Sequence, residues 1–280
     1  MTGSPEAGVW RRKLTAAVRS RGRLCVGIDP HSAILASWGL DDTVAGLDRF
    51  ARLCVEAFAS DIGVVKPQVA FFERFGSGGL AVLERTIADL RAAGVLVVAD
   101  AKRGDIGSTS EAYARAWLDP SSPLASDAVT VSPYLGVGAL TPFVEQATEH
   151  GCGLFVLART SNPEGAALQQ AVTATGASVA QAVVDEAAAV NARANDDVMG
   201  LVVGATRGHG LDLRTFSGPI LAPGLGAQGA TAQDLPSLFQ GSSELLLPNS
   251  SRDVLRHGPD VAALREAAIV ARDTVEHALA

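Results

Sequence analysis

The stretch VLVVADAKRGDIGST, at positions 95 to 109, joins an apolar run to three charged residues, Asp100, Lys102 and Asp105. In a β-strand, residues two apart face the same side, so Asp100 and Lys102 are expected to project together. Nearby carboxylates favour the ammonium form of a lysine, whereas a Schiff-base lysine needs a lowered pKa. The spacing therefore favours Lys102 as a proton donor.

A cluster of this kind suits one reaction class, decarboxylation. Two aspartates beside a substrate carboxylate would repel it, and that repulsion disappears when carbon dioxide leaves and negative charge moves to a carbon beside the ammonium. Such binding favours the transition state over the substrate. Taken alone, however, the Asp-x-Lys-x-x-Asp pattern fits ordinary salt bridges at a strand end equally well.

Two further charged residues end apolar runs. Asp29 ends the run at 23 to 29, and Lys66 lies near the end of the run at 62 to 68. Either residue alone also fits a structural role, because an aspartate after a strand commonly caps the next helix. Together with the aspartates and lysine of the third run, they predict charges of alternating sign around one pocket.

A second group of residues is suited to a phosphate. The stretch APGLGAQGA, at 222 to 230, contains Gly226 and other glycines that let backbone N–H groups approach an anion. The stretch PNSSRDVL, at 248 to 255, contains Arg252, whose guanidinium suits bidentate phosphate recognition. We therefore predict a phosphate site formed by these two segments.

Eight short apolar runs, rich in Val, Leu and Ile, are available to position these residues. They are nearly continuous rather than alternating, which is typical of parallel strands buried on both faces. Helical stretches separate them, so the chain predicts a (β/α)8 TIM barrel, with a doubly wound open sheet as the alternative. The runs are 23–29, 62–68, 95–101, 127–133, 153–159, 199–205, 218–224 and 243–249.

The chain is expected to be a single α/β domain over 1–280. Its barrel core would span about 23–256, with an N-terminal and a C-terminal helix flanking it. Amphipathic helices are predicted at 44–60, 79–94, 178–195 and 260–280. The stretch 169–178, rich in Gly, Ser and Thr, predicts an exposed loop, with a lid over the site as the alternative.

Composition excludes several classes of protein. A net charge of −7 and an isoelectric point near 5.2 disfavour nucleic acid and anionic membrane surfaces as partners. Three widely spaced cysteines predict neither disulfides nor a thiolate metal site, and the five histidines show no ligand spacing. No apolar run is long enough to span a membrane and no signal-peptide pattern precedes the first run, so a cytoplasmic location is expected.

Six separated segments resemble the orotidine 5'-phosphate decarboxylase family in its longer bacterial form. The likeness runs from about residue 23 to residue 252, in the family's order and at predicted strand ends throughout. The segments are VGIDP, VVKPQVAFFE, DAKRGDIGST, RTSNP, PGLGAQG and NSSRD.

This resemblance implies a lyase that converts orotidine 5'-phosphate to UMP and carbon dioxide in pyrimidine biosynthesis, without metal or organic cofactor. It implies that Asp100, Lys102 and Asp105 carry the chemistry, with Lys102 protonating C6. Asp29 and Lys66 match the residues that bind the ribose hydroxyls and complete the charged network.

The resemblance also implies a homodimer whose active sites are built from two chains. Asp105 and Thr109 match positions that reach into the partner's site. Ser161 matches a serine that contacts the pyrimidine edge, Gln228 a residue that touches both base and phosphate, and Arg252 the phosphate-binding arginine.

The sequence departs from the family pattern in two places. Thr130 and Leu157 lie where apolar residues line the pocket for the substrate carboxylate; Leu157 fits, while Thr130 would put a hydroxyl there. The segment 161–194 has no clear counterpart in shorter members, so the part that closes over the ligand stays open.

Three other functions are compatible with such a barrel. A related enzyme could act on sugar phosphates through a metal-bound enediolate, although the Lys66 ammonium would repel a metal ion. A Schiff-base aldolase is disfavoured by the carboxylates around Lys102. A catalytically inactive nucleotide-binding barrel would leave costly buried charges without a task.

Overall fold

The computed structural model describes residues 8–205, 208–226, 230–242 and 245–280. Eight parallel strands pair in chain order, and the last strand pairs with the first to close a barrel. Closure confirms the predicted TIM barrel and excludes the open sheet. The strands are β1 (Cys25–Ile28), β2 (Val64–Pro67), β3 (Leu96–Arg103), β4 (Ala128–Val131), β5 (Gly153–Arg159), β6 (Met199–Val203), β7 (Ile220–Pro223) and β8 (Leu246–Ser250).

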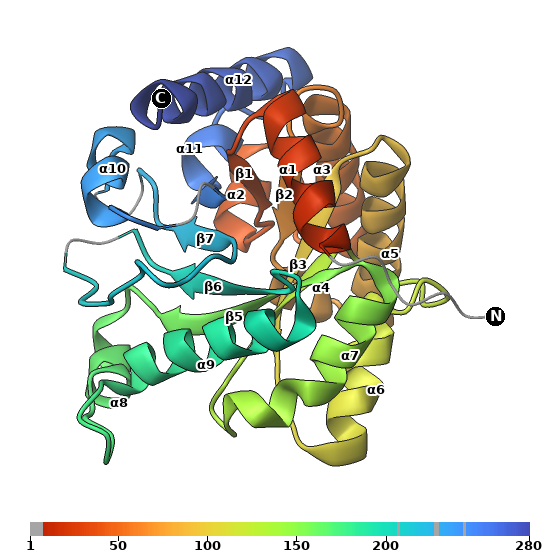
Figure 1. Ribbon diagram of the computed structural model, residues 1–280. Coiled ribbons are helices and arrows are strands. Elements are labelled where there is room, and N and C mark those ends of the chain that lie inside the picture. Colours follow the sequence, from red (N-terminus) through yellow and green to blue (C-terminus); the bar gives the residue numbers. More distant parts are fainter. Residues whose placement is uncertain (1–7, 206–207, 227–229, 243–244) are drawn as a thin grey trace.

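Helices surround the barrel on its outside, as Figure 1 shows. Three short 3₁₀ segments, Val137–Leu140, Pro163–Gly165 and Ala232–Asp234, precede helices in the loops. The helices are α1 (Val9–Arg21), α2 (Ser32–Ser37), α3 (Val44–Phe58), α4 (Ala70–Glu73), α5 (Gly76–Ala92), α6 (Gly107–Leu118), α7 (Thr141–His150), α8 (Ala166–Gln169), α9 (Val179–Ala194), α10 (Leu235–Leu238), α11 (Arg252–Leu255) and α12 (Val261–Ala278).

One connection lacks, in its described residues, the helix of the predicted strand–helix units. Between β6 and β7, the described residues 204–205 and 208–219 form no helix. Gly208 and Gly210 have positive φ there, which disfavours a continuous helix. The expected loop at 169–178 forms a short antiparallel bridge between Val172 and Ser178, and the Ser178 hydroxyl then caps α9.

Among the described residues, no helix combines the length and apolar character needed to cross a bilayer.

The barrel interior is a separate apolar cluster that α1 closes at the amino ends of the strands. Trp10 and Leu14 of α1 are fully buried and pack with inward-facing residues such as Val64 and Phe155. Gly153 opens β5 directly against the Trp10 indole, where a Cβ would lie 2.2 Å from the ring. A glycine is therefore required at this position for α1 to seat.

An ion pair fastens α1 to the barrel. Lys13 pairs with Asp127, which lies just before β4 and is 2% exposed. The same carboxylate accepts the Val97 N–H at 2.9 Å. Asp127 thus joins α1 to both β3 and β4, at the end of the barrel opposite the charged strand ends.

We expect Asp127→Ala to lower the free energy of unfolding by about 2 to 4 kcal/mol, because a buried N–H and a cation lose their acceptor. Urea denaturation measures this value. Asp212→Ala is the control, since the Asp212 carboxylate pairs with the exposed Arg214 alone among the described residues, and its loss should not change stability measurably. Equal effects of the two substitutions would contradict the proposed fastening role.

Candidate active site

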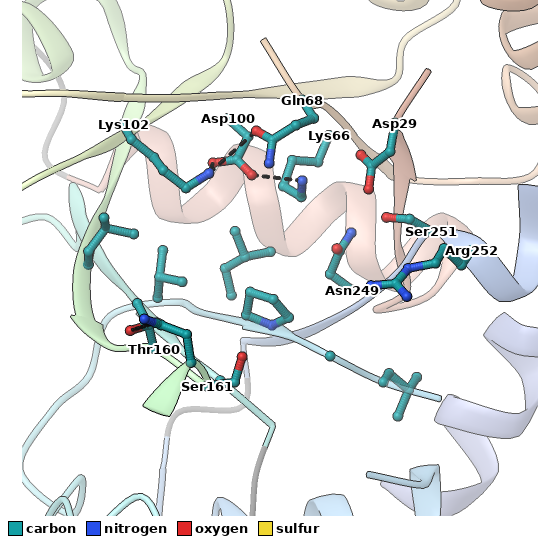
Figure 2. A pocket seen from close by; sticks show the side chains of 18 residues that line it. Asp29, Lys66, Gln68, Asp100, Lys102, Thr160, Ser161, Asn249, Ser251 and Arg252 are labelled. Carbon is teal, nitrogen blue, oxygen red and sulfur yellow. Dashed lines mark hydrogen bonds and ion pairs between the residues drawn. The ribbon is translucent and has the colours of Figure 1, made fainter. Parts of the chain in front are cut away.

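A cavity of about 340 Å³ opens at the carboxyl ends of the strands, the usual position of a TIM-barrel active site. Figure 2 shows the charged side chains along one wall and Thr160 and Ser161 on the wall opposite. The predicted site residues that the fold brings to this cavity are Asp29, Lys66, Asp100, Lys102, Ser161 and Arg252.

Three of these residues form a continuous chain of ion pairs. The Lys66 Nζ lies 2.9 Å from Asp100 Oδ2, and the Lys102 Nζ lies 2.5 Å from Asp100 Oδ1. The side chain of Lys66 is 4% exposed, whereas that of Lys102 is 44% exposed. Asp100 is therefore a shared counterion between a buried and an accessible ammonium.

These ion pairs shift the pKa values of Asp100 and Lys66 so that both side chains stay charged. Burial raises the pKa of Asp100, but Lys66 and Lys102 outweigh burial and lower it below its ordinary 3.8. Burial lowers the pKa of Lys66, but the carboxylates of Asp100 and Asp29 outweigh burial and raise it above 10.5. The stability contributed by Asp100 is thus present above pH 3.8 and lost as pH falls through its lowered folded-state pKa. That contributed by Lys66 is present below pH 10.5 and lost as pH rises through its raised pKa.

Strand closure places the first and last strands' polar residues together. Asp29 follows β1, and Ser251 and Arg252 follow β8, its neighbour in the barrel. A Cβ on Gly27 would lie 1.9 Å from the Ser251 Oγ, so only glycine allows this approach. Among the described residues, no hydrogen-bond partner reaches the buried Asp29 Oδ1, which leaves an acceptor at the cavity.

The opposite wall is the turn after β5. The Gln169 side chain holds it, since its Oε1 accepts the Thr160 N–H at 3.0 Å and its Nε2 donates to the Thr160 Oγ1 at 2.8 Å. Ser161 follows at the cavity edge, and Leu157 contributes an apolar surface nearby. The turn is therefore fixed from outside the cavity by α8.

Three predicted site residues lie outside this cavity lining. Asp105 and Thr109 are near the start of α6, outside the cavity lining, and Thr109 is exposed. Gly226 is also outside the lining; its N–H donates to the Ala230 carbonyl at 2.8 Å, and a Cβ there would collide with Asp253. Gln228 lies outside the described residues.

Sequence reasoning did not name five polar residues of the lining as site residues: Gln68, Thr160, Asn162, Asn249 and Ser251. Two of them lie at strand ends. Gln68 forms an isolated bridge with Asp100, and Asn249 donates to the Cys25 carbonyl at 2.9 Å. Both directly follow or end a recognised strand, so a survey of uncharged polar residues at strand ends would have included them. Thr130, expected at the carboxylate pocket, is not part of the lining.

Comparison with known proteins agrees with this geometry. The model of the orotidine 5'-phosphate decarboxylase / HUMPS family matches residues 22–267. An orotidine 5'-phosphate decarboxylase of Salinispora arenicola is 62% identical over 258 residues, covering 91% of this chain and 93% of the relative.

Solved structures agree as well. A crystal structure from Streptomyces avermitilis, assigned to orotidine 5'-phosphate decarboxylase, superimposes with a TM-score of 0.93 and 54% sequence identity. The match covers 100% of this chain and 98% of the Streptomyces chain. The Leishmania donovani OMP decarboxylase has a TM-score of 0.76 and 30% identity, and the match covers 96% of this chain and 98% of the Leishmania chain. The resemblance drawn from the sequence is thereby confirmed, and the chain belongs to the orotidine 5'-phosphate decarboxylase / HUMPS family.

Proposed function

We propose that this chain converts orotidine 5'-phosphate to UMP and carbon dioxide, and that Lys102 delivers the proton that replaces the carboxylate at C6. The observation that carries the proposal is the ion chain from Lys66 through Asp100 to Lys102 at the cavity wall. Relatives named for this activity, at 56% to 62% identity, support the same substrate.

The proposed reaction needs one bond to break and one to form. The bond from C6 to the carboxyl carbon breaks, its electron pair stays on C6, and carbon dioxide leaves. A proton from the Lys102 Nζ then joins that pair, and the neutral amine takes a proton from water. Asp100 repels the substrate carboxylate but not the departing neutral molecule, and the ammonium attracts the carbanion, so both interactions favour the transition state.

The remaining residues suit the rest of a nucleotide. The Asp29 Oδ1, to which no described residue donates, is an acceptor for a ribose hydroxyl, and Lys66 holds the charged network beside it. We assign the phosphate to Arg252 and the pyrimidine edge to Ser161. The family resemblance adds Gly226 to the phosphate site, and Gln228 to both the base and the phosphate. A cavity of about 340 Å³ lies within the range of small-molecule sites.

We propose that no metal or organic cofactor takes part. The positive charge of Lys66 occupies the place where a metal-dependent enediolate barrel would need a carboxylate ligand. Within the described part of the chain, no three His, Cys, Asp or Glu residues lie close enough to hold a metal ion.

We further propose a homodimer with composite active sites. Asp105 and Thr109 lie on either side of Ile106 in the chain, and Ile106 is 62% exposed at the start of α6. The β4–α7 loop, which accepts a hydrogen bond from Ser110 of α6 at Ala139, adds the exposed Tyr134 (77%) and Leu135 (52%). Such a patch is typical of a surface that another chain covers. A second copy of this chain is the partner that would bring an Asp105 to the cavity.

The domain and location follow from similar arguments. We propose one domain over 1–280, because α1 is tied to the barrel through Asp127 and α12 through the Arg272 guanidinium, which donates to the Asp61 carbonyl at 3.0 Å. The three cysteines are free and buried, which supports a reducing, cytoplasmic location.

The wild-type chain should decarboxylate orotidine 5'-phosphate, measured by loss of its absorbance, at the same rate with and without EDTA. Lys102→Ala should fold, still bind UMP and lose at least about a thousandfold in kcat, since the proton donor is gone. Lys13→Ala, a lysine paired to a carboxylate at the other barrel end, is the control and should keep wild-type kcat. Most activity surviving in Lys102→Ala would overturn the role of Lys102.

Arg252→Ala should raise KM by about tenfold to a hundredfold, because one charge-assisted contact to the phosphate is lost. Steady-state kinetics measures this change. Arg256→Ala, an exposed arginine one turn later that does not line the cavity, is the matched control. An unchanged KM in Arg252→Ala would contradict the phosphate assignment.

Co-expression of two inactive chains, Lys102→Ala and Asp105→Ala, tests the composite site. If Asp105 serves the partner's cavity, half of the dimers formed are mixed and each has one intact site, so about a quarter of wild-type activity should return. Activity no higher than that of the separate variants would refute the shared site.

A further inference from the structure

Thr130 lies behind the active-site wall, on β4 opposite the charged end of β3. It is 1% exposed. Its Oγ1 accepts the backbone N–H of Lys102 at 2.9 Å and lies 2.9 Å from the Asp100 Oδ1. Because the N–H can only donate, the oxygen must accept there, and the single hydroxyl hydrogen is free for the carboxylate.

The pairing of β3 with β4 is interrupted at this point. Ala99 pairs with Val129 and Arg103 with Val131, so β3 advances four residues while β4 advances two. The additional residues of β3 include Asp100 and Lys102, and regular strand pairing does not hold them. The Thr130 hydroxyl supplies hydrogen bonds in the interval, before the Ser132 N–H pairs with the Arg103 carbonyl at 2.7 Å.

Lys102 itself has an unusual backbone. Its φ is +50°, in the left-handed region, and among the described non-glycine residues only Asn195 shares a positive φ. Asn195 ends α9, where this conformation is common, whereas a lysine at a strand end has no such reason. A conformation of this kind persists only where neighbouring contacts enforce it. The bond to Thr130 is such a contact.

We propose that Thr130 is a positioning residue for the proton donor, an inference that rests on the proposed function. One hydroxyl fixes the backbone from which Lys102 projects and the rotation of the Asp100 carboxylate that pairs with it. With Oδ1 held by Thr130, Oδ1 faces Lys102 and Oδ2 faces Lys66. Thr130 is outside the cavity lining, so the proposed role is exerted through Lys102 and Asp100.

Substitutions of Thr130 that keep or remove the hydroxyl distinguish a positioning role from simple packing. Thr130→Val, which replaces the hydroxyl by a methyl group, should lower kcat by about tenfold to a hundredfold, because a small displacement of a reacting group costs this much. KM should stay within about threefold, since Asp29, Ser161 and Arg252 are untouched. Thr130→Ser keeps the hydroxyl and should restore most of kcat.

Thr86→Val is the matched control. Thr86 is 2% exposed and its hydroxyl donates to the Val82 carbonyl at 2.8 Å within α5, away from the site. The Thr86→Val chain should be less stable than the wild type, while its kcat stays at the wild-type value. Thr130→Ala, which adds no methyl group against Asp100, replaces Thr130→Val if that variant does not fold.

Steady-state decarboxylation of orotidine 5'-phosphate by all these chains decides between the outcomes. If the wild type and Thr86→Val do not turn over, the proposed function fails. If they do and the chains lacking the Thr130 hydroxyl keep wild-type kcat, the positioning role fails. A loss that Thr130→Ser does not restore would also overturn it, because the hydroxyl would then not be the group responsible.

Discussion

The rest of the site depends on the chain of ion pairs formed by Lys66, Asp100 and Lys102, because the buried charges of Lys66 and Asp100 must be paired. A buried charge is costly unless it is paired and hydrogen-bonded, and removing one partner of a buried ion pair typically costs about 3 to 5 kcal/mol. Asp100 meets this condition because β2 and β3 are neighbours, so that Lys66 reaches one oxygen while the bulged end of β3 presents Lys102 to the other. The charges to which we assign the chemistry are therefore also charges that the fold must satisfy.

Barrel closure brings the polar residues that follow the first and last strands to the same cavity. Asp29 follows the first strand and Arg252 follows the last, more than two hundred residues later, yet β1 and β8 are hydrogen-bonded neighbours. Gly27 permits the close approach of Ser251, so the two loops share one side of the cavity. At the opposite end, α1 seals the barrel with Trp10 and Leu14. Polar function is thus confined to the carboxyl ends of the strands, and the amino ends serve stability.

Much of this was predictable from residue types and their order. Continuous apolar runs indicate buried parallel strands, and charges that end them indicate a common pocket, which is why Asp29, Lys66, Asp100 and Lys102 could be grouped. The expectation that Asp100 and Lys102 share a face came from regular strand alternation, but β3 is irregular there and Lys102 has a positive φ. The bulge and the role of Thr130 depend on which strand lies opposite, and strand register is not encoded in local periodicity.

The two lysines of the ion chain differ in a way that assigns their roles in the proposed reaction. A proton donor must recover its proton from water after each turnover. The side chain of Lys66 is 4% exposed and sits between Asp100 and Asp29, so exchange with solvent is obstructed and its proton is held tightly. Lys102 contacts the same carboxylate but is 44% exposed, and the cavity opens beside it. Lys66 therefore suits a permanent counterion that keeps Asp100 ionised, and Lys102 suits the group that gives up its proton and regains it.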